Sequence, residues 1–98
     1  MSLDNLIRTA IANKQLLEFN YDGYHRIAEP HVYGIKDGVH EILVFQVGGE
    51  SSSGVIQGWK RMKLDKVLEM SILDQLFAGP RPSYGKHSSF DTTIAVVR

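Results

Sequence analysis

The sequence contains no cysteine in its 98 residues and only three prolines. Without thiols, the chain forms no disulfide bond, holds no metal through thiolates and performs no covalent catalysis by sulfur. No apolar run approaches the roughly 18 residues of a membrane-spanning helix. The N-terminus also lacks the charged segment and apolar core of a secretory signal. We therefore expect a cytoplasmic protein with no membrane partner.

The chain has no excess of either charge, because 11 lysine and arginine residues balance 11 aspartate and glutamate residues. Indiscriminate nucleic-acid binders usually carry a basic excess, so the balance argues against that class but permits a local basic patch. The apolar content of 43% and the charged content of 22% are typical of a folded domain. We expect a single domain over residues 1–98.

Apolar residues near the N-terminus recur at helical spacing and predict a helix over residues 3–14, with Ser2 as its N-cap. The remaining apolar segments are typical of strands, and they cover residues 16–21, 24–30, 31–35, 39–47, 57–63, 66–72 and 92–97. Two Asp-Gly pairs, Asp22-Gly23 and Asp37-Gly38, predict hairpin turns. Residues 78–89 read as a long loop.

These elements predict a mainly β (α+β) fold. We expect an N-terminal helix, a small SH3-like or Sm-like β-barrel of about five strands over residues 16–77, and a C-terminal loop and extra strand over residues 78–98. An open α+β sheet with the helix on one face is the alternative.

Two registers are compatible with the first hairpin. A two-residue turn pairs Tyr21 with Tyr24, whereas a bulged turn pairs Glu18 with Arg26. We prefer the bulged register, because it matches apolar to apolar side chains and joins opposite charges.

The run 42–45 is apolar at every position, which predicts a strand that is covered on both faces. The barrel core covers one face in this interpretation, and the helix or a second subunit covers the other. The terminal strand 92–97 has two candidate partners, its own sheet edge and another chain. A homodimer through residues 42–47 and 92–97 is therefore a further hypothesis.

Several motifs follow one another in a characteristic order. An aromatic strand ends at Tyr21, Arg26 and Pro30 form an Arg-x-x-x-Pro step, and the basic segment Trp-Lys-Arg-Met-Lys-Leu-Asp-Lys-Val covers residues 59–67, with Phe77 beyond it. Across about residues 4–77, this order resembles the WYL domain. The family's Trp-Tyr-Leu triplet reads Glu-Ile-Leu here, at residues 41–43. Lysines also replace family arginines, which keeps the charge but loses the bidentate fork.

The resemblance implies an Sm-like barrel. It also implies a role like that of WYL domains in bacterial transcription regulators, where they follow a helix-turn-helix and sense nucleotides or nucleic-acid fragments. Since 98 residues leave no room for a helix-turn-helix, we expect a stand-alone sensor or accessory module, or a fragment of a longer regulator.

The basic segment supplies most of the candidate binding residues. Trp59, Arg61 and Lys63 share one strand face, since Met62 and Leu64 point to the core. An indole beside cations suits a stacked base whose phosphate the cations hold. Together with the residues expected near the barrel mouth, the predicted ligand-binding set is Arg26, Tyr33, Trp59, Lys60, Arg61, Lys63 and Lys66.

Each of these residues also has a purely structural interpretation. The basic segment is equally typical of a solvated outer strand. Arg26 has Glu18 as a competing partner in the bulged register. Tyr33 is a candidate because Val32 and Ile35 can supply the core without it, although barrel aromatics are more often core.

The sequence suggests neither a metal site nor a catalytic site. His31 and His40 lie on paired strands but roughly 10–13 Å apart, too far to share one zinc ion. His25 and His87 lie elsewhere, and neither serines 51–53 nor Asp65 joins a catalytic arrangement. We expect a non-enzymatic ligand-binding regulatory module that needs no cofactor and senses a nucleotide or short single-stranded nucleic acid. The alternative is a non-catalytic assembly or dimerisation module with no small-molecule ligand.

Overall fold

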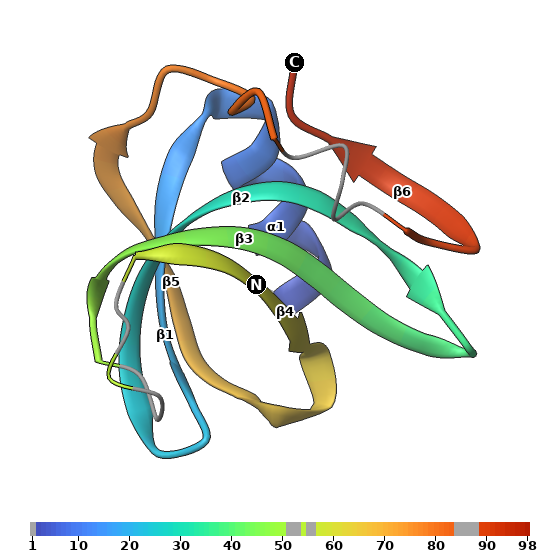
Figure 1. Ribbon diagram of the computed structural model, residues 1–98, viewed down its shortest axis with the longest axis horizontal. Helices are drawn as coiled ribbons and strands as arrows, with labels where there is room; N and C mark the ends of the chain where they lie inside the picture. The colour runs from blue at the N-terminus through green and yellow to red at the C-terminus, as the bar shows by residue number, and fades with distance from the viewer. Residues whose placement is uncertain (1, 51–53, 55–56, 84–88) are drawn as a thin grey trace.

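The structure is a computed structural model that describes residues 2–50, 54, 57–83 and 89–98. It is mainly β, with an N-terminal helix followed by six antiparallel strands (Figure 1). The elements in chain order are α1 (Leu3–Asn13), β1 (Gln15–Tyr21), β2 (Tyr24–Lys36), β3 (Val39–Gly49), β4 (Gly58–Lys63), the 3-10 turn η1 (Leu64–Lys66), β5 (Val67–Leu76) and β6 (Thr92–Val96).

Helix α1 begins and ends at clear caps. The Ser2 side chain accepts a hydrogen bond from the Asn5 backbone N–H at 3.2 Å. Lys14 ends the helix in the left-handed conformation, with φ of 54°. Ile7 and Ile11 are buried on the face that packs against the sheet. The predicted helix and its N-cap are confirmed.

The strands lie in the order β4-β3-β2-β1-β5, and β6 pairs with β2. The predicted barrel does not close, because no ladder joins β4 to β5 among the described residues. A side-chain contact ties the end of β4 to β1 instead, since the Lys63 backbone N–H donates to the Tyr21 hydroxyl at 3.2 Å. The result is a strongly curved open sheet (Figure 1).

The first hairpin takes the two-residue turn, with Tyr21 opposite Tyr24. Both residues of the Asp-Gly turn have positive φ angles, 53° and 78°, as a type I′ turn requires. This turn matches the right-handed twist of the strands, and it outweighs the charge pairing that favoured the bulged register. The bulged register is therefore wrong. Glu18 bonds to His25 Nε2 at 2.8 Å and not to Arg26.

Strand β2 pairs with β3 along one edge, and two strands share its other edge. On that second edge, the first half of β2 pairs with β1, and the second half pairs with β6 from Val32 opposite Val96 to Ile35 opposite Thr92. Figure 1 shows β6 running beside the far end of β2. The terminal strand β6 is therefore part of the same sheet as the other five strands.

The central strand β3 is covered on both faces, as predicted. Ile42, Leu43 and Val44 are fully buried, and the guanidinium of Arg81 lies 3.8 Å from the centroid of the Phe45 ring. The second face is thus covered by the described parts of the chain's own C-terminal segment (residues 78–83 and 89–98), in place of the helix or second subunit that we expected. Since β3 also lies between β2 and β4 in the sheet, its backbone edges are both paired.

Gly34 allows β6 to approach β2. A Cβ at this position would lie 2.3 Å from the Thr92 carbonyl oxygen and 2.9 Å from the Phe90 ring. We expect Gly34→Val to displace β6. Valine is compatible with the strand conformation of β2, but its side chain would overlap the Thr92 carbonyl oxygen, which is part of the β6 backbone and cannot move away while β6 stays paired. Hydrogen exchange of the amides of residues 92–96 should accelerate while β3 stays protected. In the control Gly48→Ala, the new Cβ makes only an ordinary 3.5 Å contact, and β6 should stay docked. Unchanged protection of β6 in Gly34→Val would contradict this role.

Candidate functional site

Trp59, the predicted base-stacking residue, is packed against other side chains of the chain. Its ring meets the Phe45 ring edge-on at 5.2 Å and the His31 ring at 4.7 Å between centroids. Its indole N–H donates to the Ser83 hydroxyl at 2.8 Å. The C-terminal segment therefore lies against this indole, and aromatic packing accounts for its position.

Arg61, the predicted phosphate contact, also has internal partners. Its Nε donates to Glu41 Oε1 at 3.0 Å, and its Nη2 donates to the Ser89 carbonyl at 3.0 Å. Its guanidinium stands 4.3 Å from the centroid of the Phe90 ring. The positive charge is thus balanced by Glu41, and an aromatic ring of the C-terminal segment lies against the guanidinium that was predicted to hold a phosphate.

The three candidate lysines lie in different places. Lys63 is exposed at the end of β4, and Lys66 is exposed in η1. Lys60 is half-buried and lies opposite Val44, on the core-facing side of β4 by strand alternation. The structure therefore brings Trp59 and Arg61 together on one covered face and separates Lys60 from both.

Tyr33 belongs to the core. It is 1% exposed, and its hydroxyl donates to Asp4 Oδ1 at 2.9 Å. Burial, reinforced by this hydrogen bond, raises the pKa of Tyr33 to about 12. Tyr33 ties α1 to β2 and presents no surface to a ligand.

Arg26 is the most unusual of the predicted residues. It is 4% exposed, and no carboxylate lies within salt-bridge distance of it among the described residues. Its Nη1 donates to Gln46 Oε1 and its Nη2 to the Tyr21 carbonyl, both at 3.3 Å. Its Nε has no hydrogen-bond partner in the described part of the chain. A guanidinium at this depth normally has a carboxylate beside it.

Two aromatic rings and a fixed amide surround this guanidinium. The Arg26 Cζ lies 5.4 Å from the centroid of the Tyr21 ring and 5.8 Å from that of Tyr24. The Gln46 Nε2 donates to the carbonyls of Gly48 and Glu50 at 3.0 and 2.9 Å. These bonds direct the Gln46 oxygen toward the guanidinium. We call Tyr21, Tyr24, Arg26 and Gln46 the Arg26 site.

Lys60 shares the face of the sheet that carries the Arg26 site. Gln46 lies opposite Gly58, and Val44 lies opposite Lys60, one step along the same face. Two predicted cations, Arg26 and Lys60, are thus on the concave side of the sheet. The other cations of the basic segment are on the convex side or at the strand's end.

Sequence reasoning missed one cluster, which we call the Arg81 latch (Glu29, His31 and Arg81). The Arg81 guanidinium donates to both carboxylate oxygens of Glu29, at 2.7 and 3.1 Å. The backbone N–H of Arg81 donates to His31 Nε2 at 3.2 Å. The hydrogen bond with Glu29 raises the pKa of Arg81. Since 50 residues separate His31 from Arg81, no local pattern linked them.

His31 makes this latch sensitive to acid. Its Nε2 accepts from Arg81 while its Nδ1 donates to the Glu29 carbonyl at 3.0 Å, so the neutral ring is the form that fits. Burial lowers the pKa of His31. The unfolded chain then binds a proton more readily than the folded chain, and stability falls as the pH drops below about 6.5 toward the lowered value.

We expect the midpoint of thermal unfolding to fall over this pH window, and His31→Gln to reduce the dependence. A glutamine amide can still donate and accept but does not titrate. His25→Gln, which changes an exposed histidine paired with Glu18, is the matched control and should leave the dependence in place. Equal pH profiles for the wild type and His31→Gln would refute the assignment.

No three histidine, aspartate or glutamate side chains are grouped as metal ligands within the described ranges. His87 and serines 51–53 lie outside those ranges. None of the described helices is long and apolar enough to cross a membrane. Comparisons of the chain with models of known protein families, with curated proteins and with solved structures found no match.

Proposed function

We propose that the chain is a WYL-like, non-enzymatic regulatory module that binds a phosphate-bearing ligand, a nucleotide or short single strand, at the Arg26 site. One observation carries the proposal. Arg26 is 4% exposed, and among the described residues its guanidinium has no carboxylate partner and its Nε has no hydrogen-bond partner. Holding a charge in this state costs free energy. A bound anion would offset that cost.

The chemistry of the site favours phosphate over other anions. A guanidinium presents a planar fork of donors that matches phosphate oxygens. The Tyr21 and Tyr24 rings, which already flank Arg26, provide faces on which a base can stack. Lys60 adds a second cation on the same side of the sheet, and exposed Lys63 and Lys66 raise the local attraction for anions.

We also propose that the curved sheet is an opened SH3-like or Sm-like barrel. Two features support this kinship. The strand order places β1 between β2 and β5, and the Tyr21–Lys63 hydrogen bond ties the end of the outer strand β4 to β1, the neighbour of β5.

Calorimetric titration with adenosine 5′-monophosphate, adenosine, inorganic phosphate and an oligothymidylate tests the proposal. We expect the monophosphate to bind at least tenfold more tightly than adenosine, and the difference to shrink between 50 and 300 mM salt. Equal affinity for the nucleoside and its monophosphate, or no binding of any probe, would exclude phosphate recognition.

The second candidate function is assembly of copies of the chain, and the exposed side chains of β5 favour it. Leu68 and Leu76 are 64% and 68% exposed, on a strand that pairs only with β1 among the described elements. Exposed leucines on an open edge favour strand addition. Sedimentation of Leu68→Lys against the wild type tests this. Of the surfaces predicted from sequence, residues 42–47 have both backbone edges paired within the sheet, whereas β6 pairs with β2 along one edge. A homodimer through residues 42–47 and 92–97 stays a prediction.

A further inference from the structure

The Arg26 guanidinium has one edge of N–H donors without a partner. Its Nη1 and Nη2 each donate to a neutral acceptor, the Gln46 side-chain oxygen and the Tyr21 carbonyl, and both distances are 3.3 Å. Its Nε has no hydrogen-bond partner among the described residues. In a guanidinium, Nε and one terminal nitrogen lie side by side and donate in parallel, which matches two oxygens of one phosphate group. The remaining donors therefore fit a single oxyanion.

Arg26 lies below the surface of the protein. Of the four residues of the Arg26 site, only Tyr24 is partly exposed, and the other three are buried. On β3, Gly49 lies directly opposite Arg26, so close that a Cβ on Gly49 would lie 2.9 Å from the Arg26 Cα. Strands β2 and β3 leave no gap at this point, so a ligand reaches the guanidinium past the Tyr24 ring. The group that enters this recess has to be narrow.

A terminal phosphate fits such a recess better than a phosphate inside a strand. A terminal phosphate monoester is attached through one ester bond and presents three free oxygens with a charge of about −2 at neutral pH. A phosphate inside a strand carries a sugar on both sides and a charge of about −1. Because no carboxylate offsets Arg26 among the described residues, the larger charge compensates it more fully. Shape and charge therefore favour the same end group.

A strand bound along its length needs a row of cations, and the described cations of the basic segment do not form one. Proteins that hold single strands follow the backbone with a positively charged groove. Arg61 and Arg81 are each paired with a glutamate, at 3.0 and 2.7 Å, on the outer face of the sheet. Lys63 ends β4, and Lys66 lies in η1. No continuous positive track therefore leads from the Arg26 site.

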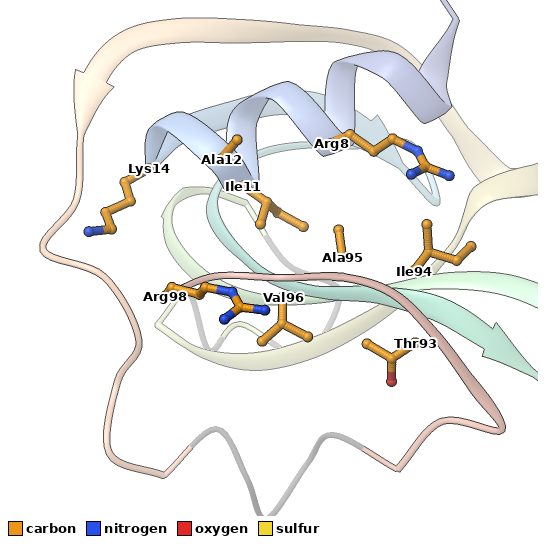
Figure 2. Close-up of a pocket in the computed structure, with 9 residues that line it drawn as sticks. All are labelled: Arg8, Ile11, Ala12, Lys14, Thr93, Ile94, Ala95, Val96 and Arg98. Carbon is orange, nitrogen blue, oxygen red and sulfur yellow. The ribbon is translucent and has the colours of Figure 1, made fainter.

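The cations between α1 and β6 do not converge on one anion either. They line a groove of about 560 Å³ and comprise Arg8, Lys14 and Arg98 (Figure 2). Arg8 is paired with Asp4 at 2.8 Å, and Figure 2 shows the Lys14 and Arg98 side chains extending in different directions. Arg26 is the only buried lysine or arginine among the described residues. The structure thus concentrates its demand for an anion at one point.

We infer, on the basis of the proposed function, that the Arg26 site recognises a terminal phosphate of a nucleotide or short strand and not the phosphates within the strand. The phosphate bonds to the fork that contains the Arg26 Nε. The base next to it stacks on the Tyr24 ring, the partly exposed member of the site. Nucleotides beyond the first extend away from the protein and add little affinity.

Capping one phosphate oxygen tests the preference for a monoester. Thymidine 5′-monophosphate and thymidine 3′-monophosphate are each titrated calorimetrically beside their methyl esters, which keep the base and one negative charge. Whichever isomer binds more tightly should lose at least tenfold in affinity on methylation. In Arg26→Met, this difference between ester and monophosphate should disappear. Equal affinity of the monophosphate and its methyl ester in the wild type would overturn the inference.

Strand length tests whether only the end is recognised. Oligothymidylates of three and six nucleotides are compared without a terminal phosphate and with one at the 5′ or the 3′ end. We expect a terminally phosphorylated form to bind at least tenfold more tightly than the unphosphorylated strand and within threefold of the matching monophosphate. The slope of log K against log salt should stay near −0.7, about one phosphate contact, at both lengths. A slope that steepens with length would overturn the inference.

The exposed lysines provide a second check. Lys63→Gln with Lys66→Gln should lower the affinities for the monophosphate and for the phosphorylated hexamer by the same factor, threefold at most. A larger loss for the hexamer would mean that the strand runs along these lysines, against the inference.

Failure of this inference is distinguishable from failure of the proposed function. If monophosphate, methyl ester and unphosphorylated hexamer bind equally well and all lose affinity in Arg26→Met, phosphate binding at Arg26 stands and end recognition is wrong. If no phosphate-bearing probe binds the wild type, both are wrong.

Discussion

Arg26→Met is expected to reduce binding of adenosine 5′-monophosphate at least tenfold while the free energy of unfolding stays within about 1 kcal/mol of the wild-type value. Methionine fills a similar volume without a charge, and replacing a buried charge by an apolar side chain is often neutral or stabilising. Two neutral acceptors, on Gln46 and Tyr21, lose a donor, which opposes that gain by a similar amount. Calorimetric titration and urea unfolding measure the two effects separately.

Arg26→Lys is the control for geometry. It keeps the positive charge but loses the planar fork, so it should retain a salt-dependent but weaker affinity for the monophosphate. If Arg26→Met instead destabilises the protein by 3 kcal/mol or more, with nucleotide affinity unaltered, Arg26 is a structural residue and the proposed site is wrong.

Arg81→Met should destabilise the protein by about 2 kcal/mol, which corresponds to a fall of roughly 10 °C in the unfolding midpoint for a chain of this size. The substitution leaves the Glu29 side chain, only 10% exposed, without its cation. We expect less than the loss typical of a fully buried pair, because the Arg81 side chain is 41% exposed. The emission of Trp59 should shift to the red as Ser83 and its neighbours lift from the indole.

A double-mutant cycle provides the control for the Arg81 latch. The double mutant Glu29→Gln/Arg81→Met lacks both charges. Its loss of stability should be smaller than the sum of the losses in the two single mutants. Additive losses would show that the two side chains do not interact energetically. An unchanged Trp59 spectrum in Arg81→Met would show that the latch does not control the cover over the indole.

Local patterns predicted most of the secondary structure. The 3–14 periodicity and Ser2 indicated α1, and the Asp-Gly pairs located both hairpin turns, because these signals depend on neighbours in sequence. The first hairpin register was wrong because pair matching was weighted above turn geometry. Asp22 and Gly23 both have positive φ angles, and this two-residue turn places Tyr21 opposite Tyr24. Side-chain pairs worth a few tenths of a kcal/mol do not outweigh that constraint.

The candidate site was harder to predict, because its determinants are long-range. Alternation correctly grouped Trp59 with Arg61 on one face of β4. It contained no information about Phe90, which follows Arg61 by 29 positions and stacks on it, or about Arg81, which stacks on Phe45. Arg26 was identified by resemblance and by type. Its lack of a carboxylate partner is a property of the folded environment that no sequence pattern expresses.

The contacts of the C-terminal segment resemble those of a bound ligand. Arg81 over Phe45, Phe90 over Arg61 and Ser83 on Trp59 imitate stacking and phosphate-type hydrogen bonding on the outer face of β3 and β4. A molecule that competes for that face can bind only when the C-terminal segment has left it. The measured dissociation constant is then the intrinsic one divided by the fraction of protein molecules in which the segment is undocked. Each 1.4 kcal/mol of docking free energy therefore weakens such a competitor tenfold. Protonation of His31 removes the acceptor for the Arg81 backbone N–H, so a lower pH should raise the fraction of molecules in which this face of β3 and β4 is open.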